Sequence, residues 1–389
     1  MTLWTIIPRD PLIFRDGKPF TAAPGARAKS LPFPYPSTIV GAVRTMAGTD
    51  AQTGKFDTNR ITELLQKQII GPVLGELADE EITYLFPAPA DALLLKAENE
   101  GQAMRQWVRP IETPADALTD LENFSLIGPK KIIKEKPHSK QPHFWYKDEY
   151  FKWLENPRDN LVDLSQLGHN GPQAESRTHV SINPQTHTAA PGALFQTSGL
   201  EYCHTEENEN DDEHVKLTNA KTLAMVVETD ADLQESLGFL GGERRVAQWR
   251  QTEFNFPACP GSINQTIKDH GACRLILLTP AYFAEGFLPT WLLAQYGLEI
   301  RAVATSRYQT VSGWDYKDNR EKPTRRLVPA GSVYFLKFTE PTRKADIEKF
   351  INEIWMQTIS DKAQNRLDGF GLAILGTWDG NLKDVEVES

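Results

Sequence analysis

Three glycines near the C-terminal end of the chain have the type and spacing of a backbone site for an anion. Gly369 and Gly371 follow a helical pattern, the apolar run 372–375 comes next, and Gly376 ends it. Glycine permits a positive φ and lets a backbone approach a ligand without a Cβ in the way. Free amides at such a helix-to-strand junction can bind phosphate. We therefore expect these glycines to contact an anionic ligand, with a simple structural turn as the alternative.

A predicted helix near the N-terminus offers a second phosphate site. The chain before Ser37 is rich in proline, and Ser37 is the expected N-cap of a helix with apolar residues at 39, 40 and 43. Free amides beside Ser37 and Thr38 attract phosphate, and Arg44 lies nearly two turns further on. Gly41 costs this helix about 1 kcal/mol relative to Ala, which favours close approach of another backbone.

Two adjacent arginines form a third candidate. The segment 233–240 has a helix-like pattern that Gly241 and Gly242 would end. Arg244 and Arg245 are then expected to project from a turn, where neighbouring guanidinium groups can bind phosphate. Pairing of these arginines with acidic side chains of the same chain is an equally open alternative.

A long β-hairpin is predicted over about 176–200. Its arms, 177–184 and 192–197, are rich in β-branched and aromatic residues, and a polar loop joins them. Arg177 and His179 lie on the first arm. A histidine within a strand is commonly a structural hydrogen-bonding residue, so that reading of His179 stays open beside a functional one.

Charge is distributed unevenly along the chain. The net charge of −10 opposes free-standing nucleic-acid binding, because such affinity comes largely from Lys and Arg. Residues 128–147 nevertheless carry six lysines against one glutamate, and residues 301–326 carry seven basic side chains against three acidic ones. These basic segments either face RNA, with Arg307, Trp314 and Arg325 as candidates, or are solvated loops. The acidic block 206–213 is expected to be a solvated loop.

Aromatic residues follow the lysine-rich segment closely. They allow two interpretations: base stacking beside the basic charges, or the core of an inserted helix. The residues concerned are Trp145, Tyr146, Tyr150, Phe151 and Trp153.

The order of predicted elements indicates an α+β fold. The chain opens with a strand over 3–7, and its C-terminal third follows the order βαββαβ, which is that of a ferredoxin-like (RRM-type) unit. This arrangement leaves one sheet face free to bind RNA, as RRM modules do. Strands are expected over 274–279, 298–304, 331–338 and 372–375, and helices over 288–296 and 345–359.

Several motifs carry a resemblance to a known family. Arg9-Asp10-Pro11-Leu12 with Phe14-Arg15-Asp16-Gly17, and the segment Pro36–Arg44, resemble the RAMP proteins of CRISPR systems. The segments 311–315 and 328–335, with the glycine-rich end, resemble more specifically the third Cmr-type subunit of type III-B effector complexes. The resemblance implies two ferredoxin-like (RRM-type) domains with helical and β-hairpin insertions. Residues 1–265 would hold a basic helical insertion (about 115–160) and the thumb-like hairpin, and 266–389 the glycine-rich loop.

The resemblance also implies a function. Such subunits bind the 5′ tag of the crRNA and bridge the large polymerase-like subunit to the crRNA-bound backbone RAMP subunits, without catalysis. Their hairpin presses on the crRNA, a role that falls here to Arg177 and His179. The loop 370–375 lacks the charge that is usual in the family, so backbone contacts are expected there. The expected RNA contacts are Arg9, Ser37, Thr38, Arg44, Arg177, His179, Arg244, Arg245, Arg307, Trp314, Arg325, Gly369, Gly371 and Gly376.

Neither a catalytic site nor a cofactor is expected. None of the eight histidines lies in the first helix or the glycine-rich loop, and the three cysteines form neither a disulfide framework nor a zinc pair. A CRISPR-precursor endoribonuclease of the RAMP type, with His179 or a neighbour as general base, is the alternative. No apolar stretch approaches the roughly 20 residues that span a bilayer. The start of the chain lacks signal-peptide features, so we expect a cytoplasmic protein without membrane contact.

Overall fold

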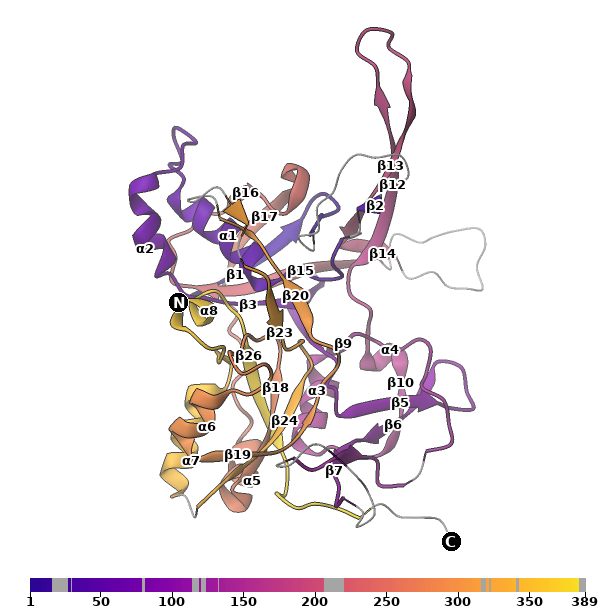
Figure 1. Ribbon diagram of the computed structural model, residues 1–389, viewed down its shortest axis with the longest axis vertical. Helices are drawn as coiled ribbons and strands as arrows, with labels where there is room; N and C mark the ends of the chain where they lie inside the picture. The colour runs from indigo at the N-terminus through magenta and orange to yellow at the C-terminus, as the bar shows by residue number, and fades with distance from the viewer. Residues whose placement is uncertain are drawn as a thin grey trace. The chain divides into compact units, whose positions relative to one another are not determined.

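The computed structural model describes residues 1–15, 27–28, 30–78, 81–113, 119, 124–131, 133–205, 220–315, 320–321, 323–340 and 343–384 (Figure 1). The chain divides into two compact units that alternate along the sequence. Unit 1 comprises Met1–Thr83, Gly171–Glu253 and Thr310–Arg325, and unit 2 comprises Tyr84–Asn170, Phe254–Gln309 and Arg326–Ser389. This grouping differs from a single boundary near 265, because the segment around 115–160 belongs with the C-terminal strands.

Unit 1 is built on an antiparallel sheet with strand β1 at its centre. β1 pairs with β15 on one side and β17 on the other, β3 lies outside β15, and β16 lies outside β17. Ile6, Val226 and Trp249 from these strands are fully buried and form its core. The strands are β1 (Thr2–Pro8), β3 (Ile69–Ala78), β14 (Cys203–Thr205, paired with β15), β15 (Ala220–Thr229), β16 (Ser236–Phe239) and β17 (Val246–Thr252).

Helices and a hairpin complete unit 1. α1 buries an apolar stripe that includes Ile39, Val40 and Val43, in agreement with the predicted pattern. β12 and β13 form the hairpin, and β2 pairs with β13. The bounds are α1 (Pro36–Gly48), η1 (Thr58–Arg60), α2 (Ile61–Leu65), η3 (Gly242–Arg244), β2 (Arg27–Ala28), β12 (Gln173–Ile182), β13 (Ala189–Glu201), β21 (Trp314–Asp315) and β22 (Arg320–Glu321).

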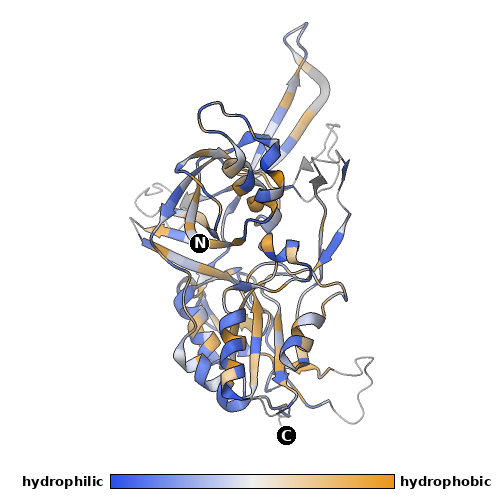
Figure 2. Cartoon of the chain, turned by 90° about the vertical axis from the view of Figure 1, so that its left-hand side faces the viewer, coloured by the Kyte–Doolittle hydropathy of each residue, from blue (hydrophilic) through white to orange (hydrophobic). Residues whose placement is uncertain are grey.

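Unit 2 contains a second antiparallel sheet, of order β19-β24-β18-β26-β25. α7 packs against it through Ile347, Phe350, Ile351 and Ile354, the amphipathic stripe that the sequence predicts. Figure 2 shows these strands in orange beside helices that are blue on their outer side. The elements are β18 (Ala272–Leu277), β19 (Leu298–Ala304), β24 (Val333–Phe338), β25 (Gln357–Thr358), β26 (Leu372–Thr377), α5 (Gly261–His270), α6 (Thr290–Tyr296), α7 (Lys344–Ile354) and α8 (Ala363–Leu367).

The segment 84–170 adds smaller elements to unit 2. β6 lies between β10 and β5, and β9 lies between β4 and β11. The bounds are β4 (Glu81–Pro87), β5 (Ala92–Lys96), β6 (Gln102–Trp107), β7 (Arg109–Pro110), β8 (Ile127–Gly128), β9 (Phe144–Tyr146), α3 (Lys147–Glu155), β10 (Asn160–Asp163), α4 (Leu164–Leu167) and β11 (Gly168–His169). Two further short strands are β20 (Gln309–Val311) and β23 (Arg325–Leu327).

Both units share one strand arrangement. In unit 2 the strands β18, β19, β24 and β26 follow one another along the chain, with α6 after the first and α7 after the third. The first strand lies between the third and the fourth, and the second lies outside the third. In unit 1 the strands β1, β3, β15 and β17 have the same order, and α1 follows the first. The predicted α+β class and the βαββαβ order of the C-terminal elements are confirmed.

Several predicted boundaries are wrong. The helix expected over 233–240 is instead the edge strand β16, which pairs with β17 from Ser236 to Phe239. α1 begins at Pro36, one residue before the predicted N-cap Ser37, because Tyr35 holds the extended N-cap backbone and proline needs no amide partner at the first helical position. The helix expected to reach Ile359 ends at Ile354, and β25 follows it.

Aromatic residues after the lysine-rich segment belong to the core of unit 2. Trp145, Tyr150 and Trp153 are at most 1% exposed. Trp145 meets Trp153 edge to face, with ring centroids 6.1 Å apart. For these three residues, the core interpretation is therefore correct, and base stacking is excluded.

The three thiols differ in environment, which predicts a simple labelling pattern. Cys203 is exposed, whereas burial raises the pKa of Cys259 and of Cys273 to about 12. Because the thiolate is the reactive form, we expect iodoacetamide at pH 8 to alkylate Cys203 alone in the folded protein. Mass spectrometry of the labelled peptides measures this, with the unfolded protein as the control. Alkylation of Cys273 as fast as Cys203 would contradict the burial described.

Candidate nucleic-acid interface

The glycine-rich segment is engaged within the protein. Gly371 has a φ of +79°, and its amide donates to the carbonyl oxygen of Pro280 at 2.9 Å. Its own carbonyl accepts from the amide of Ile359 at 2.9 Å. A Cβ on Gly371 would lie 2.8 Å from Ser360 Oγ. The expected positive φ is present, but the expectation of an open amide cradle for phosphate is wrong, because this amide is already bonded.

Gly369 and Gly376 are also buried. The amide of Gly369 donates to the carbonyl of Arg366 at 3.1 Å, and its carbonyl accepts from Thr279 Oγ1 at 2.7 Å. Gly376 lies within β26, where a Cβ would stand 2.9 Å from Nη2 of Arg274. Neither residue presents its backbone at the surface of unit 2, so the structural-turn alternative describes this segment.

Arg274 explains why Gly376 is a glycine. Its guanidinium is fully buried, and Nη1 donates to Asp91 Oδ2 at 2.5 Å. Nε donates to the carbonyl of Thr377 at 2.9 Å, and Nη2 to the carbonyl of Trp153 at 2.6 Å. Asp91 Oδ1 also accepts from Trp153 Nε1 at 3.0 Å. This buried ion pair joins the segment 84–170 to the C-terminal sheet within unit 2.

The residues of the predicted phosphate site at the start of α1 make contacts within the protein. Nη2 of Arg44 donates to the carbonyl oxygens of Leu65 and Lys67, both at 3.2 Å, so it binds the end of α2. The amide of Thr38 donates to the carbonyl of Tyr35 at 3.0 Å, and Ser37 and Thr38 are half-buried in the first turn. A Cβ on Gly41 would meet no atom within 4 Å, so the expected close approach of another backbone is absent.

The two arginines at the predicted turn have different surroundings. Arg245 Nη2 lies 3.1 Å from Glu243 Oε2, which is the acidic partner that the alternative interpretation requires. Arg244 is exposed, and its guanidinium lies 4.4 Å from the centroid of the Phe239 ring. Glu243 and Arg244 both have a positive φ, at +59° and +53°. Arg9, also in unit 1, is exposed and donates to Gln248 Oε1.

The hairpin presents the clearest candidate surface in unit 1. Its first face pairs His179 with Phe195 and Arg177 with Thr197. The rings of His179 and Phe195 stack with centroids 5.1 Å apart, and His179 Nε2 lies 2.8 Å from Thr197 Oγ1. Arg177 is 46% exposed, and its hydrogen bond from Nε to Glu175 Oε1 raises the pKa of Arg177. We call His179, Phe195, Arg177 and Thr197 the hairpin face.

Near its polar tip the hairpin exposes apolar side chains on both strands. Val180, Ile182 and Leu194 are 41%, 53% and 59% exposed, and Val180 faces Leu194 across the two strands. In Figure 1 the ribbon of β12 and β13 continues well past the strands of unit 1. The predicted hairpin is confirmed, with arms longer than expected.

A second exposed cluster lies in unit 2. Tyr308 is 51% exposed, and the guanidinium of Arg326 lies 4.7 Å from its ring centroid. The predicted residue Arg307 is its exposed neighbour in sequence. Arg325 begins β23 and is half-buried, whereas Trp314 lies in β21 with its side chain outside the described part of the structure.

Sequence reasoning missed Phe195, Tyr308 and Arg326. Each is an aromatic or basic residue directly beside a predicted contact, either across the hairpin or along the basic segment 301–326. Cross-strand partners of a predicted hairpin residue could have pointed to Phe195, since the register follows once the turn is placed.

A metal site would need a group of ligating side chains in the described ranges. These residues contain no set of three His, Cys, Asp or Glu side chains that could hold a metal ion. The acidic block 206–213 lies outside the described residues. In the same part of the chain, no helix is both long and apolar enough to cross a bilayer.

Comparison with known proteins finds similar solved structures. Two chains from cryo-EM structures are similar at 18% identity and a TM-score of 0.44 each. The first structure is the type III-B Cmr-beta complex bound to cognate target RNA and AMPPnP (state 1), with 90% of this chain and 89% of that chain covered. The second is the same complex bound to cognate target RNA, with 86% of each chain covered. No curated protein matches the sequence.

A family model covers almost the whole chain. The model described as CRISPR-associated protein (Cas_Cmr3) matches residues 4–378, which include most of both units and the whole hairpin face. The motifs at both ends of the chain fall within this match. The chain therefore belongs to the CRISPR-associated Cas_Cmr3 family.

Proposed function

We propose that this chain is a non-catalytic RNA-binding subunit of a type III-B CRISPR (Cmr) effector complex. It would hold the 5′ tag of the crRNA and bridge the large polymerase-like subunit to the crRNA-bound backbone RAMP subunits in the cytoplasm. Family membership supports the assignment to CRISPR interference. The strand order shared by the two units supports a pair of ferredoxin-like folds. In unit 1 the edge strand β16 lies in the chain between β15 and β17, where such a fold has its second helix.

The single observation that carries RNA binding is the hairpin face. Strand β12 is exposed along most of its length, and such an exposed arm adds little to the stability of the fold, because a hairpin on its own is marginally stable in water. The stacked pair His179–Phe195 offers an aromatic surface, and Arg177 adds a cation beside it. Stacking platforms next to basic charge are how single-stranded RNA is commonly bound. The hairpin face therefore suits the thumb-like role.

Two features support a non-catalytic subunit. Cleavage of RNA by a metal-independent route needs a general base together with a group that stabilises the leaving 5′-oxygen. His179 Nε2 already has Thr197 Oγ1 as its partner, and the ring is stacked on Phe195. These two contacts favour a structural role for His179 on the hairpin face over that of a general base.

Substitution on the hairpin face tests the RNA contact. We expect Phe195→Ala to weaken binding of a tag-containing RNA about fivefold to a hundredfold, since base stacking on an aromatic is worth about 1–3 kcal/mol. Arg177→Ala should lower the salt slope of binding by about 0.7 if it contacts one phosphate. Fluorescence anisotropy at several salt concentrations measures both.

The matched control lies on the opposite face of the same ribbon. Gln196→Ala removes only a long contact to Thr178 Oγ1, at 3.4 Å, and should leave affinity and salt slope unchanged. Equal losses in all three variants would mean that the hairpin is merely unfolded. Unchanged affinity in Phe195→Ala and Arg177→Ala, with normal circular dichroism, would contradict the assigned contact.

A further inference from the structure

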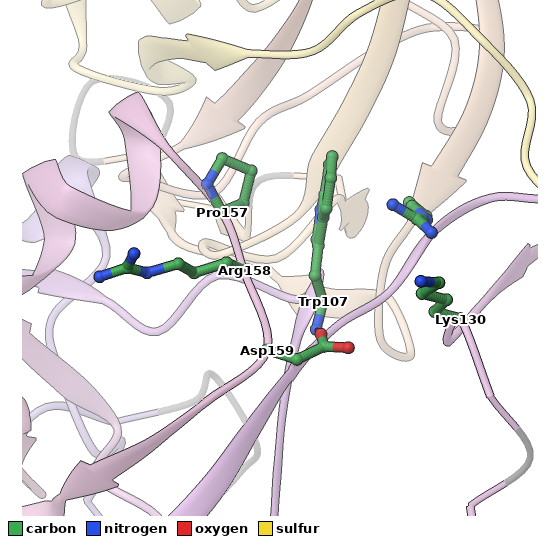
Figure 3. A pocket seen from close by; sticks show the side chains of 6 residues that line it. Trp107, Lys130, Pro157, Arg158 and Asp159 are labelled. Atoms are coloured by element: carbon green, nitrogen blue, oxygen red, sulfur yellow. The ribbon is translucent and has the colours of Figure 1, made fainter.

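A small pocket in unit 2 is lined by none of the residues assigned above. Its volume is about 200 Å³, and its lining comes entirely from the segment 84–170 (Figure 3). Trp107 is the last residue of β6, Arg109 begins β7, and Lys130 follows β8 within the lysine-rich segment. The remaining lining residues are Pro157, Arg158 and Asp159, from the connection between α3 and β10.

An indole ring stands in the middle of this pocket. Figure 3 shows Trp107 with Pro157 and Arg158 on one side and Lys130 on the other. The position of Trp107 is fixed through its amide, which donates to Asp159 Oδ1 at 2.8 Å. The guanidinium of Arg109 lies 5.3 Å from the centroid of the indole. The pocket thus combines an aromatic surface with basic groups placed around it.

Positive charge dominates the lining. Three basic side chains stand against the single carboxylate of Asp159, in a protein whose net charge is −10. The positive charge of Arg158 also affects Arg105 next to the pocket. Burial lowers the pKa of Arg105, Glu149 raises it, and the charge of Arg158 lowers it. Arg109 Nε and Trp107 Nε1 are buried donors without a hydrogen-bond acceptor among the described residues. Such a lining favours a ligand that brings negative charge and oxygen acceptors.

The volume of the pocket and the chemistry of its lining favour one class of ligand. Pockets for drug-sized molecules occupy about 300–1,000 Å³, so this one suits a single planar ring with its substituent. An acidic peptide side chain would meet the charges but leave the indole unused. A nucleotide uses both, because its base stacks on an aromatic and its phosphate binds Arg and Lys.

We propose that this pocket binds one nucleotide of single-stranded RNA, with the base against Trp107 and the phosphate between Arg109 and Lys130. On binding, the Arg109 side chain leaves the indole for the phosphate. The inference rests on the proposed RNA-binding function and adds a contact on the segment 84–170, separate from the hairpin face.

Photo-crosslinking of the full chain tests the pocket without relying on a variant. Single-stranded RNAs that carry 5-iodouridine at successive positions are bound, irradiated and digested, and crosslinked peptides are mapped by mass spectrometry. We expect a crosslink at Trp107 for one register of the probe. Crosslinks that map only to other segments, while the RNA is bound, would overturn this inference and leave the proposed function standing. Failure of the chain to bind any of these RNAs would overturn both.

Charge removal gives an independent readout. Arg109 and Lys130 share one phosphate, so each of Arg109→Ala and Lys130→Ala should lower the salt slope of RNA binding by up to about 0.7, the value for one phosphate contact on a single strand. Lys96→Ala is the matched control, since Lys96 is exposed, lies in the segment 84–170 outside the lysine-rich segment and does not line the pocket. If Arg109→Ala fails to fold, Lys130→Glu and the crosslink at Trp107 decide. Equal slopes in the Lys130 and Lys96 variants would contradict the proposed contact.

Discussion

Replacement of Arg274 by Leu is expected to lower the free energy of unfolding of unit 2 by about 3–5 kcal/mol, because it leaves the carboxylate of Asp91 buried without its cation. Both side chains are 0% exposed. Three backbone carbonyls, those of Thr377, Trp153 and Leu154, each also lose one donor. Denaturant unfolding followed by tryptophan fluorescence measures the loss, since Trp153 adjoins the pair.

A double-mutant cycle separates the ion pair from simple loss of packing. Asp91→Leu alone should be strongly destabilising for the same reason, whereas the double variant should lose less than the sum of the two single losses. Arg343→Ala is the control, because Arg343 is 86% exposed in its pair with Asp346 and should change stability little. Strictly additive losses at positions 274 and 91 would show that the pair is not coupled.

Gly371→Val is expected to lower the melting temperature clearly and to leave the RNA affinity of the folded fraction unchanged. A φ of +79° is strained for any residue with a Cβ, at a cost of about 1–3 kcal/mol. The added Cβ would also stand 2.9 Å from the backbone nitrogen of Ser360. Melting temperature and RNA affinity are measured on the same preparation.

Gly41 supplies the matched comparison. It lies on the exposed side of α1, where a Cβ would meet nothing within 4 Å. Gly41→Ala should therefore stabilise the protein by up to about 1 kcal/mol through helix propensity. Normal melting of Gly371→Val together with lost RNA affinity would restore the ligand-facing interpretation that the structure argues against.

Local patterns in the sequence predict much of the fold. The strands β18, β19, β24 and β26 follow from apolar runs, and α7 follows from the spacing of Ile347, Phe350, Ile351 and Ile354. These signals are local, because they depend only on the spacing of apolar residues along a short stretch. The helix predicted over 233–240 was wrong because such spacing does not always decide. The apolar residues there fit either a helix or an edge strand, and the pairing with β17 decides between the two.

The contacts of the candidate residues could not be predicted from the sequence, because their partners are distant in the chain. A Cβ at Gly376 would meet the guanidinium of Arg274. Arg274 is in turn bound by Asp91, which is 183 residues away in sequence. The positive φ of Gly371 could be expected from its position after a helix, but the partner of its amide, Pro280, could not. His179 and Arg177 were placed correctly on a hairpin, and their contact with RNA stays a prediction.

We propose above all that this chain holds the 5′ tag of a crRNA without cutting it. The most direct measurement is to incubate the purified full chain with end-labelled crRNA, without metal, and to read both RNA length and nuclease protection along the strand. We predict intact RNA with protection concentrated at the 5′ tag, unchanged in length for His179→Ala. Cleavage at one site by the unmodified chain, lost in His179→Ala, would contradict the account and identify a CRISPR-precursor endoribonuclease.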